Sequence, residues 1–228
     1  VRTGETLGIV GESGSGKTTL ARSLVGLVKP YRGSVLFEGH PAHPTGPGRV
    51  AYLRKVQLIY QHPYEALSPR MTVQAAIAEP LRRHRLCAPK DVADRVADLM
   101  SQVDLSPDLG GRFPAQLSGG QCQRVAIARA LAFDPHVLIA DEVTSALDVT
   151  LQAQVMDLLL KLQKERGLTM IFISHDLAVI RRLCNSVIVM RRGEIVEAGP
   201  TGAVFDAPEQ AYTRELIDAI PRLQGDAA

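Results

Sequence analysis

Short apolar runs recur along the chain and predict the strands of a buried sheet. They fall at residues 7–10, 34–37, 137–140, 169–173 and 186–190, and helical patterns separate them. Most of these runs are continuously apolar rather than alternating, which is typical of strands covered on both faces in a parallel sheet. Strands that alternate with helices predict an α/β fold whose sheet is mainly parallel.

Apolar residues spaced three or four positions apart predict the helices. One such pattern covers residues 17–28, with an apolar face that extends to Leu27, and another covers residues 151–162 and stops near Gly167. We expect these apolar residues to belong to the core rather than to a partner-binding zipper. Residues 41–48 are rich in proline and glycine and predict a surface loop.

The pattern changes between residues 70 and 110, where helical spacing continues without a clear strand. The simplest account is a helical subdomain inserted in the α/β core. We therefore predict one domain over residues 1–228, with its core at 1–61 and 133–228 and the subdomain at about 62–132. The apolar positions that form the two helix faces are Val73, Ile77 and Leu81, then Val92, Val96 and Leu99.

Composition and charge favour an ordinary globular protein. The 228 residues have 46% hydrophobic content, which is enough for a sizeable core. The formal net charge of +2 is too small to indicate a basic surface that binds nucleic acid, so we expect no nucleic-acid partner. Cys87, Cys122 and Cys184 are widely separated, which argues against a zinc site or a disulfide framework and favours reduced thiols in the cytosol.

The apolar runs predict no membrane-spanning segment. None approaches the roughly 20 residues that cross a bilayer, and the start lacks the charged and apolar regions of an export signal. Any membrane contact would therefore come through a partner. The chain begins with Val1 and enters a motif almost at once, so we expect the natural polypeptide to start further upstream.

The first chemical motif lies between an apolar strand pattern and a helical one. Residues 11–18 match G-x-x-x-x-G-K-[ST], the pattern of a phosphate-binding loop. Glycines let successive backbone N–H groups converge on phosphate oxygens at a helix N-terminus, while Lys17 reaches the β- and γ-phosphates and Thr18 holds Mg²⁺. The residues predicted to bind the nucleotide are Gly11, Glu12, Ser13, Gly14, Ser15, Gly16, Lys17, Thr18 and Thr19.

A pair of carboxylates follows the buried strand at residues 137–140. Ligands of open α/β sheets bind at the carboxyl ends of strands, where Asp141 and Glu142 would lie. We expect Asp141 to hold Mg²⁺ and Glu142 to polarise the water that attacks the γ-phosphate. Taken alone, an Asp-Glu pair at this place is more often a solvated loop, but the phosphate-loop motif favours the functional interpretation.

A second glycine-containing loop, Leu-Ser-Gly-Gly-Gln at residues 117–121, precedes another helical pattern and is again suited to an anion. This pentapeptide resembles the signature of the ATP-binding-cassette (ABC) ATPases. Its place between the phosphate loop and the carboxylate pair makes the resemblance specific. The resemblance implies that the γ-phosphate of ATP bound to an opposing subunit is capped by Ser118, Gly119, Gly120 and Gln121.

Three further positions match the same family. Gln61 resembles the Q-loop glutamine, which senses Mg²⁺ and the attacking water and links the site to a membrane partner. Asp148 ends a segment that resembles the D-loop, which crosses the dimer interface, and His175 resembles the switch histidine that contacts the γ-phosphate. The resemblance implies an ATPase that uses ATP and Mg²⁺, with Glu142, His175 and Gln61 as catalytic residues and Thr18, Gln61 and Asp141 at the metal.

Several longer segments are similar to the ATPase subunits of bacterial oligopeptide and dipeptide importers. This similarity implies a second ABC ATPase domain, integral membrane permease subunits and an extracytoplasmic solute-binding protein as partners. It also implies a peripheral location on the cytoplasmic face of the bacterial inner membrane. Related systems carry nickel, glutathione or opines, and the cargo is selected elsewhere. The similar segments are residues 56–64, 67–73, 78–81, 145–154 and 212–213 with 220–221.

The sequence departs from the family pattern at its start. Family members usually have an antiparallel strand region before the phosphate loop, with an aromatic residue that stacks on adenine, and here that region is largely missing. An alternative is a soluble ABC ATPase of DNA repair, chromosome maintenance or translation, but the coiled coils and zinc modules of such proteins are not visible. A P-loop kinase or GTPase explains neither residues 117–121 nor His175.

Overall fold

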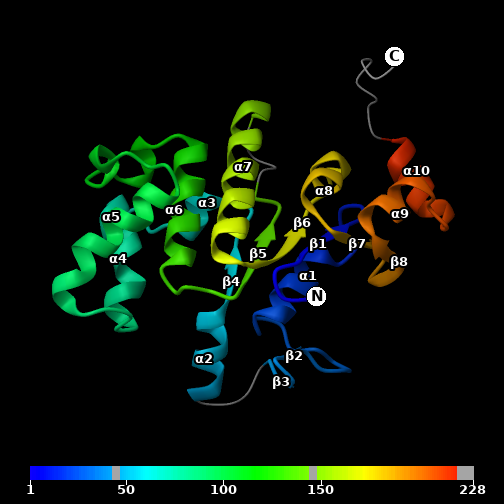
Figure 1. Ribbon diagram of the computed structural model, residues 1–228, viewed down its shortest axis with the longest axis horizontal. Coiled ribbons are helices and arrows are strands. Elements are labelled where there is room, and N and C mark those ends of the chain that lie inside the picture. Colours follow the sequence, from blue (N-terminus) through cyan, green and yellow to red (C-terminus); the bar gives the residue numbers. More distant parts are fainter. Residues whose placement is uncertain (43–46, 144–147, 220–228) are drawn as a thin grey trace.

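A six-stranded sheet forms the centre of the computed structural model, which describes residues 1–42, 47–143 and 148–219 (Figure 1). The first five strands of its spatial order are parallel, and only the last pair is antiparallel. The predicted mainly parallel α/β fold is therefore confirmed. The spatial order is β4 (Val56–Ile59), β5 (Val137–Asp141), β6 (Thr169–Ile173), β1 (Thr6–Val10), β7 (Ser186–Arg191) and β8 (Glu194–Pro200).

The two faces of the sheet belong to two apolar clusters. On β6, Phe172 lies in the larger cluster, whereas its neighbours Ile171 and Ile173 lie in the smaller one. Successive side chains of a strand point to opposite faces, so both faces are covered. Burial of each such side chain stabilises the fold by about 1.5–3 kcal/mol. This double coverage explains why the strands are continuously apolar in sequence.

The register of the parallel strands aligns their carboxyl ends. Asp141 at the end of β5 pairs with Ile173 at the end of β6, and Ile9 on β1 also pairs with Ile173. β1 lies between β6 and β7, and β5 lies between β4 and β6. Residues that follow β1, β4, β5 and β6 consequently meet at one edge of the sheet, where ligands of such sheets bind.

Four helices connect the strands of this core. The carboxylate of Asp148 accepts the Leu151 N–H at 2.9 Å and caps one of them at its start. That helix ends at Gly167, whose φ of 63° is the left-handed conformation common at helix ends. The four helices are α1 (Lys17–Leu24), α2 (Pro47–Lys55), α7 (Val149–Arg166) and α8 (Leu177–Leu183).

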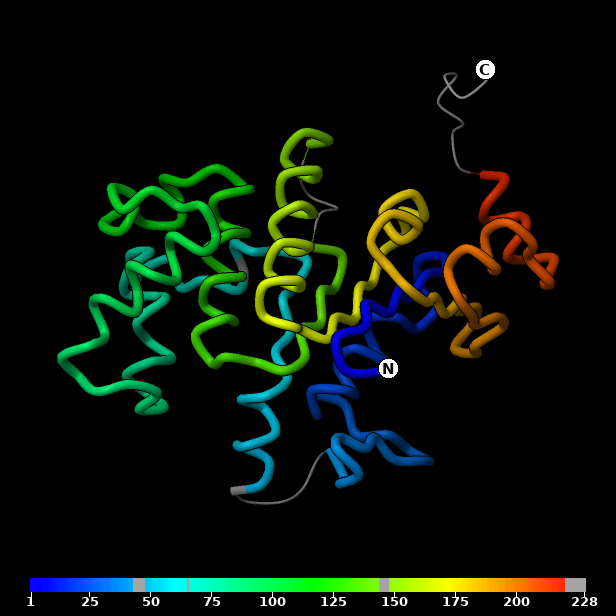
Figure 2. The backbone as a smooth tube through the Cα atoms, in the orientation of Figure 1, coloured from blue at the N-terminus to red at the C-terminus, as the bar shows by residue number. Residues whose placement is uncertain are grey.

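A helical segment occupies the chain between β4 and β5 and lies at one end of the molecule (Figure 2). Its helices pack on one another, with Ile77, Leu99 and Val125 fully buried. The division of the chain at 61/62 and 132/133 stays a prediction. The α-helices of the segment are α3 (Pro63–Ala66), α4 (Val73–Arg83), α5 (Val92–Gln102) and α6 (Gly119–Leu131), and its 3₁₀ turns are Pro89–Asp91, Pro107–Leu109 and Pro114–Gln116.

Two short helices, α9 (Thr201–Asp206) and α10 (Ala211–Asp218), follow β8 at the opposite end of the molecule (Figure 2). α9 packs on β8 and β7, which places the late part of the chain beside the last two strands of the sheet. Among the described residues, no helix is both long and apolar enough to cross a membrane.

Local differences from the sequence predictions have physical causes. The first helix ends at Leu24 rather than at residue 28, because Gly26 takes a φ of 69° and leaves Leu27 outside the helix and 58% exposed. Of the predicted strand at 34–37, only β2 (Leu36–Phe37) pairs, with β3 (His40–Pro41). The predicted loop at 41–48 is wrong at its end, where Pro47 begins α2. Proline is well suited to a first helical position.

Candidate nucleotide-binding site

The phosphate-loop residues lie between β1 and α1 in a conformation that requires glycine. Gly11, Gly14 and Gly16 have φ values of 149°, 79° and 102°. A Cβ atom on Gly11 would lie 2.1 Å from the Met190 carbonyl oxygen. α1 has no acidic residue in its first turn, so its free N–H groups present a positive helix end to this loop. The geometry fits a phosphate group.

Lys17 is buried and points back into the loop. Its Nζ atom donates to the carbonyl oxygens of Gly11 and Glu12, each at 2.8 Å. Burial lowers the pKa of Lys17, while the carboxylates of Asp141 and Glu142 act in the opposite direction. A partly desolvated cation held beside converging N–H groups is suited to the charge of a nucleotide phosphate.

Thr18 and Asp141 form a pair of oxygen ligands where α1 meets β5. The Thr18 hydroxyl donates to Asp141 Oδ1 at 3.3 Å, and Asp141 is 5% exposed. Burial raises the pKa of Asp141, and the hydrogen bond from Thr18 opposes this effect. Among the described residues, no group of three or more His, Cys, Asp or Glu side chains could hold a metal. One or two protein oxygens beside a phosphate site nevertheless fit Mg²⁺, which keeps most of its ligands as water and substrate phosphates.

Glu142 lies at the centre of the three predicted catalytic residues. Its Oε2 atom accepts a hydrogen bond from Gln61 Nε2 at 3.0 Å and lies 3.5 Å from Nδ1 of His175. The Glu142 side chain is 19% exposed and that of His175 is 62% exposed. The Glu142 N–H donates to the Ile173 carbonyl at 2.9 Å, which ties the residue to the neighbouring strand. The structure therefore brings these three side chains together at the predicted edge of the sheet.

The signature residues lie in the helical segment, at the start of α6. Ser118 caps this helix: its Oγ atom accepts from the Gln121 N–H at 3.3 Å, and Gln121 Oε1 accepts from the Ser118 N–H at 3.0 Å. Ser118 is exposed, Gly119 is half-buried and Gly120 is buried against Leu151 of α7. The hydrogen bonds of Ser118 and Gln121 connect them to each other and not to the phosphate loop. Within one chain the structure does not bring the two glycine loops together.

The predicted D-loop is described only at its last residue. Asp148 is exposed, and its carboxylate caps α7 through the Leu151 N–H rather than bonding to the phosphate loop. Residues 145–147 of this motif, and residues 220–221 of the importer-like C-terminal segment, lie outside the described residues.

Two contacts of the phosphate loop were missed from the sequence. The Gly193 N–H donates to the Ser15 carbonyl at 2.9 Å, and the Glu12 N–H donates to the Tyr212 hydroxyl oxygen at 3.1 Å. Tyr212 is 4% exposed although it belongs to a short helix near the end of the chain. No local pattern connects residues 200 positions apart, so only the fold could show this contact.

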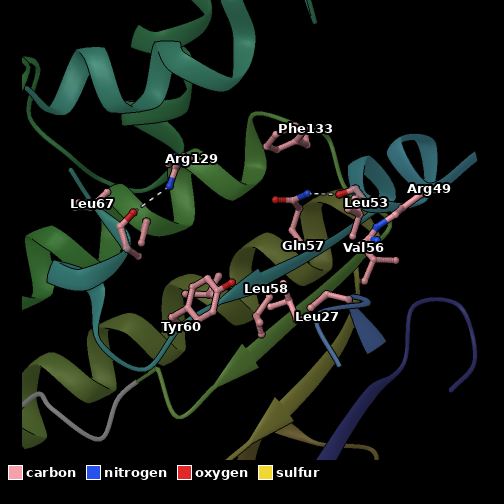
Figure 3. A pocket seen from close by; sticks show the side chains of 14 residues that line it. Leu27, Arg49, Leu53, Val56, Gln57, Leu58, Tyr60, Leu67, Arg129 and Phe133 are labelled. Carbon is pink, nitrogen blue, oxygen red and sulfur yellow. Dashed lines mark hydrogen bonds between the residues drawn. The ribbon is translucent and has the colours of Figure 1, made fainter. Parts of the chain in front are cut away.

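Two of the cavities in the described part of the chain are large, and both lie away from the phosphate loop. One, of about 690 Å³, lies between β2 and the amino ends of β5 and β6, and includes Phe37 and His136. The other, of about 320 Å³, lies between α2, β4 and α6 (Figure 3). Figure 3 shows Leu27, Tyr60 and Arg129 around it, and Tyr60 directly precedes Gln61. Neither cavity is lined by residues 11–19.

The strand, glycine loop and helix, with Lys17 in the loop and a Thr18–Asp141 pair beside it, define a P-loop nucleotide-binding protein. Comparison with known proteins narrows this class. Residues 1–145 match the family model described as ABC transporter, and the chain belongs to this family. The predicted family and the predicted ABC-ATPase fold are thereby confirmed.

The most similar curated relatives include importer subunits. The chain is 50% identical over 219 residues to the glutathione import ATP-binding protein GsiA of Escherichia coli (strain K12). It is 49% identical, also over 219 residues, to the GsiA protein of Pectobacterium atrosepticum. Both matches cover 96% of this chain and 35% of the relative, so the chain spans about a third of the length of these relatives.

Solved structures of the family have the same fold. The cbiO1 protein from Clostridium perfringens, described as part of the ABC transporter complex cbiONQ, matches with a TM-score of 0.82 and 30% identity, over 97% of this chain and 86% of that chain. The ATP-binding cassette MJ0796, in a dimeric post-hydrolysis state with ADP and Pi, matches with a TM-score of 0.78 and 32% identity, over 88% of this chain and 87% of that chain.

Proposed function

We propose that this chain binds and hydrolyses ATP and that the energy drives import of a peptide-like small solute through a membrane partner. The observation that carries the proposal is the meeting of Lys17, the Thr18–Asp141 pair and Glu142 at one edge of the sheet. The similarity to a glutathione import ATP-binding protein supports the importer assignment and makes glutathione the first substrate to test.

The phosphate loop and its surroundings bind the nucleotide in this proposal. The N–H groups of residues 11–19 and the Lys17 ammonium would hold the β- and γ-phosphates, while Thr18, Asp141 and Gln61 are the residues that would hold Mg²⁺. When bound, Mg²⁺ neutralises charge that develops on the phosphates. The buried position of Lys17 strengthens its attraction for an anion, because water screens a buried charge less.

Glu142 is the general base of the proposed hydrolysis. Its carboxylate accepts the proton of the water that attacks the γ-phosphate, and the product is ADP and phosphate. Gln61 holds this carboxylate by the 3.0 Å hydrogen bond and helps to orient the water. His175 lies beside the same carboxylate and donates to the γ-phosphate. Most of the rate gain comes from positioning and from neutralised charge.

The signature completes the site of a second molecule. Ser118 to Gln121 are presented at an exposed helix start and lie apart from the phosphate loop of their own chain. We therefore assign them, with Asp148, to the ATP site of a partner cassette. ATP binding would close the two cassettes and hydrolysis would release them, because the ligand favours the closed arrangement that it bridges.

The cavity in Figure 3 is the proposed contact with the membrane partner. It is lined by Leu27 and Tyr60, which are 58% and 42% exposed, and it lies between the sheet and the helical segment proposed for residues 62–132. Tyr60 directly precedes Gln61, so movement of this groove would reach the Glu142 carboxylate. The chain would then lie on the cytoplasmic face of the bacterial inner membrane, beside permease subunits that receive solute from an extracytoplasmic binding protein.

Uptake by vesicles tests this function. The protein is purified with its membrane subunits and placed in vesicles, and ATP-dependent uptake of labelled glutathione and of dipeptides is measured. We expect uptake that needs Mg-ATP and stops in the Glu142→Gln variant. Purification with ribosomes or DNA instead of membrane subunits would support a soluble ABC ATPase.

A further inference from the structure

Tyr212 makes a hydrogen bond to the backbone of the phosphate loop from a helix near the other end of the chain. Its hydroxyl oxygen accepts the Glu12 N–H at 3.1 Å. The side chain is 4% exposed, and the Arg191 guanidinium lies 4.5 Å from the centre of its ring. The ring is therefore held on one side by β7 and presents its hydroxyl group to the loop.

Several hydrogen bonds of the phosphate loop converge on Glu12. Its carbonyl oxygen accepts from Lys17 Nζ at 2.8 Å and from the Ser15 N–H at 3.1 Å, while its N–H is bonded to Tyr212. The Tyr212 bond therefore fixes the same residue that holds the Lys17 ammonium. Adjacent Gly11, with a φ of 149°, does not restrain this part of the backbone by itself.

α10 is in turn attached to the sheet by Glu197 of β8. The two carboxylate oxygens of Glu197 accept the N–H groups of Glu209 and Gln210, at 2.9 and 3.2 Å, just before α10 begins. Tyr212 follows two residues later. A chain of contacts therefore leads from β8 through the start of α10 to the phosphate loop.

We propose that Tyr212 is a positioning residue. It couples the packing of helix α10 on the sheet to the affinity of the phosphate loop for nucleotide. With the Glu12 backbone held, less loop entropy is lost when phosphate binds. Because coupling between two sites is reciprocal, bound nucleotide also stabilises α10 on the sheet. This inference rests on the proposed nucleotide-binding function and adds a determinant of affinity outside the motifs.

The test compares wild type with Tyr212→Phe in the full chain. Phenylalanine keeps the buried ring and its contact with Arg191 and removes only the oxygen that accepts the Glu12 N–H. We expect the Kd for fluorescent MANT-ADP and the KM for Mg-ATP to rise about 3- to 10-fold, the loss of one hydrogen bond. Turnover at saturating ATP should change less than about twofold, because Tyr212 contacts no reacting group. Tyr31→Phe is the matched control, since Tyr31 is 94% exposed.

Hydrogen exchange separates positioning from simple packing. In the nucleotide-free Tyr212→Phe protein, the peptide that contains Glu12 should exchange faster, while the strands β1 and β7 keep their protection. Glu197→Ala offers a second route to the same result, because it releases the start of α10 without changing Tyr212. It should raise the Kd for MANT-ADP in the same direction.

Three outcomes would overturn the inference. Unchanged or tighter MANT-ADP binding by Tyr212→Phe would remove Tyr212 from control of affinity. If Tyr212→Phe lowers the melting temperature but leaves the Kd for MANT-ADP and the hydrogen exchange of the Glu12 peptide unchanged, Tyr212 acts only by packing. A wild-type protein that binds no MANT-ADP would overturn this inference together with the proposed function, whereas wild-type binding that Tyr212→Phe does not alter would overturn the inference alone.

Discussion

The Gln61 side-chain amide donates a 3.0 Å hydrogen bond to the carboxylate of Glu142, although the two residues are 81 positions apart. Each follows the carboxyl end of one of two neighbouring parallel strands, β4 and β5. Their parallel pairing brings the two side chains to the same edge of the sheet. The hydrogen bond from Gln61 therefore helps to hold the Glu142 carboxylate in place, and Gln61 alone separates the proposed base from Tyr60 and the cavity that it lines.

Glu142→Gln should retain ATP binding and lose turnover. The amide keeps the size of the side chain but takes up no proton, so the rate of phosphate release should fall by about 100-fold or more. Phosphate release measures turnover, and light scattering with Mg-ATP measures the expected dimer. Glu38→Gln is the matched control, because Glu38 is a half-exposed carboxylate that pairs with Lys55 on the surface. Wild-type turnover in Glu142→Gln would remove this residue from its proposed role.

Ser118→Arg should prevent ATP-dependent association of two cassettes. Ser118 is exposed at the helix start, and an arginine there would fill the space proposed for the phosphate of the partner molecule. We expect MANT-ADP binding by the chain's own phosphate loop to remain within about twofold, because the hydrogen bonds of Ser118 are to Gln121 and not to that loop. Light scattering of the Ser118→Arg, Glu142→Gln double variant should show monomer in Mg-ATP. A normal dimer would count against a site shared between molecules.

The sequence predicted the elements whose signals are local. Residues 137–140 and 169–173 are continuously apolar and form strands whose side chains are buried on both faces of the sheet. The phosphate loop at residues 11–16 is one continuous motif, so the sequence shows it directly. β8 (Glu194–Pro200) was missed because its side chains are half-buried or exposed and leave no continuous apolar run. Antiparallel pairing with β7 stabilises this strand, and the pattern of side chains within residues 194–200 does not reveal that pairing.

Long-range contacts limit what the sequence shows of the candidate site. The meeting of Gln61, Glu142 and His175 was expected only through a family resemblance, since a lone glutamine or histidine after a strand has no distinctive local pattern. No motif or family resemblance predicted the hydrogen bond between Tyr212 and Glu12. The register of parallel strands produces the first arrangement, and the packing of α10 produces the second.

Gly11→Ala should destabilise the protein more than Gly14→Ala. A Cβ atom at position 11 would lie 2.1 Å from the Met190 carbonyl and 2.8 Å from the Ser15 hydroxyl, whereas position 14 has open space. Both positions have positive φ, so each substitution includes a backbone cost of about 1–2 kcal/mol. The steric conflict should bring the Gly11→Ala loss to about 3 kcal/mol or more, measured as the free energy of unfolding in urea. Equal losses would show that β7 moves away at little cost.

The stabilisation that Glu197 gives to α10 should disappear in acid. Burial acts to raise the pKa of Glu197, but the Thr213 hydroxyl group beside it, hydrogen bonds from the Glu209 and Gln210 amides and the charge of Arg214 lower it below the ordinary value of 4.5 overall. A carboxylate with a lower pKa in the folded state stabilises that state fully above pH 4.5, where both states are ionised.

As the pH falls below 4.5, the unfolded chain takes up the proton first, so this stabilisation is lost through the lower pKa of the folded state. The difference in free energy of unfolding between wild type and Glu197→Gln should therefore be constant near neutral pH and shrink in acid. Urea titrations from about pH 7 to about pH 3 measure it. Glu194→Gln serves as the control, because Glu194 is an exposed carboxylate on the same strand. A difference near zero, or one that stays constant down to the lowest pH, would mean that the charge of Glu197 does not hold α10.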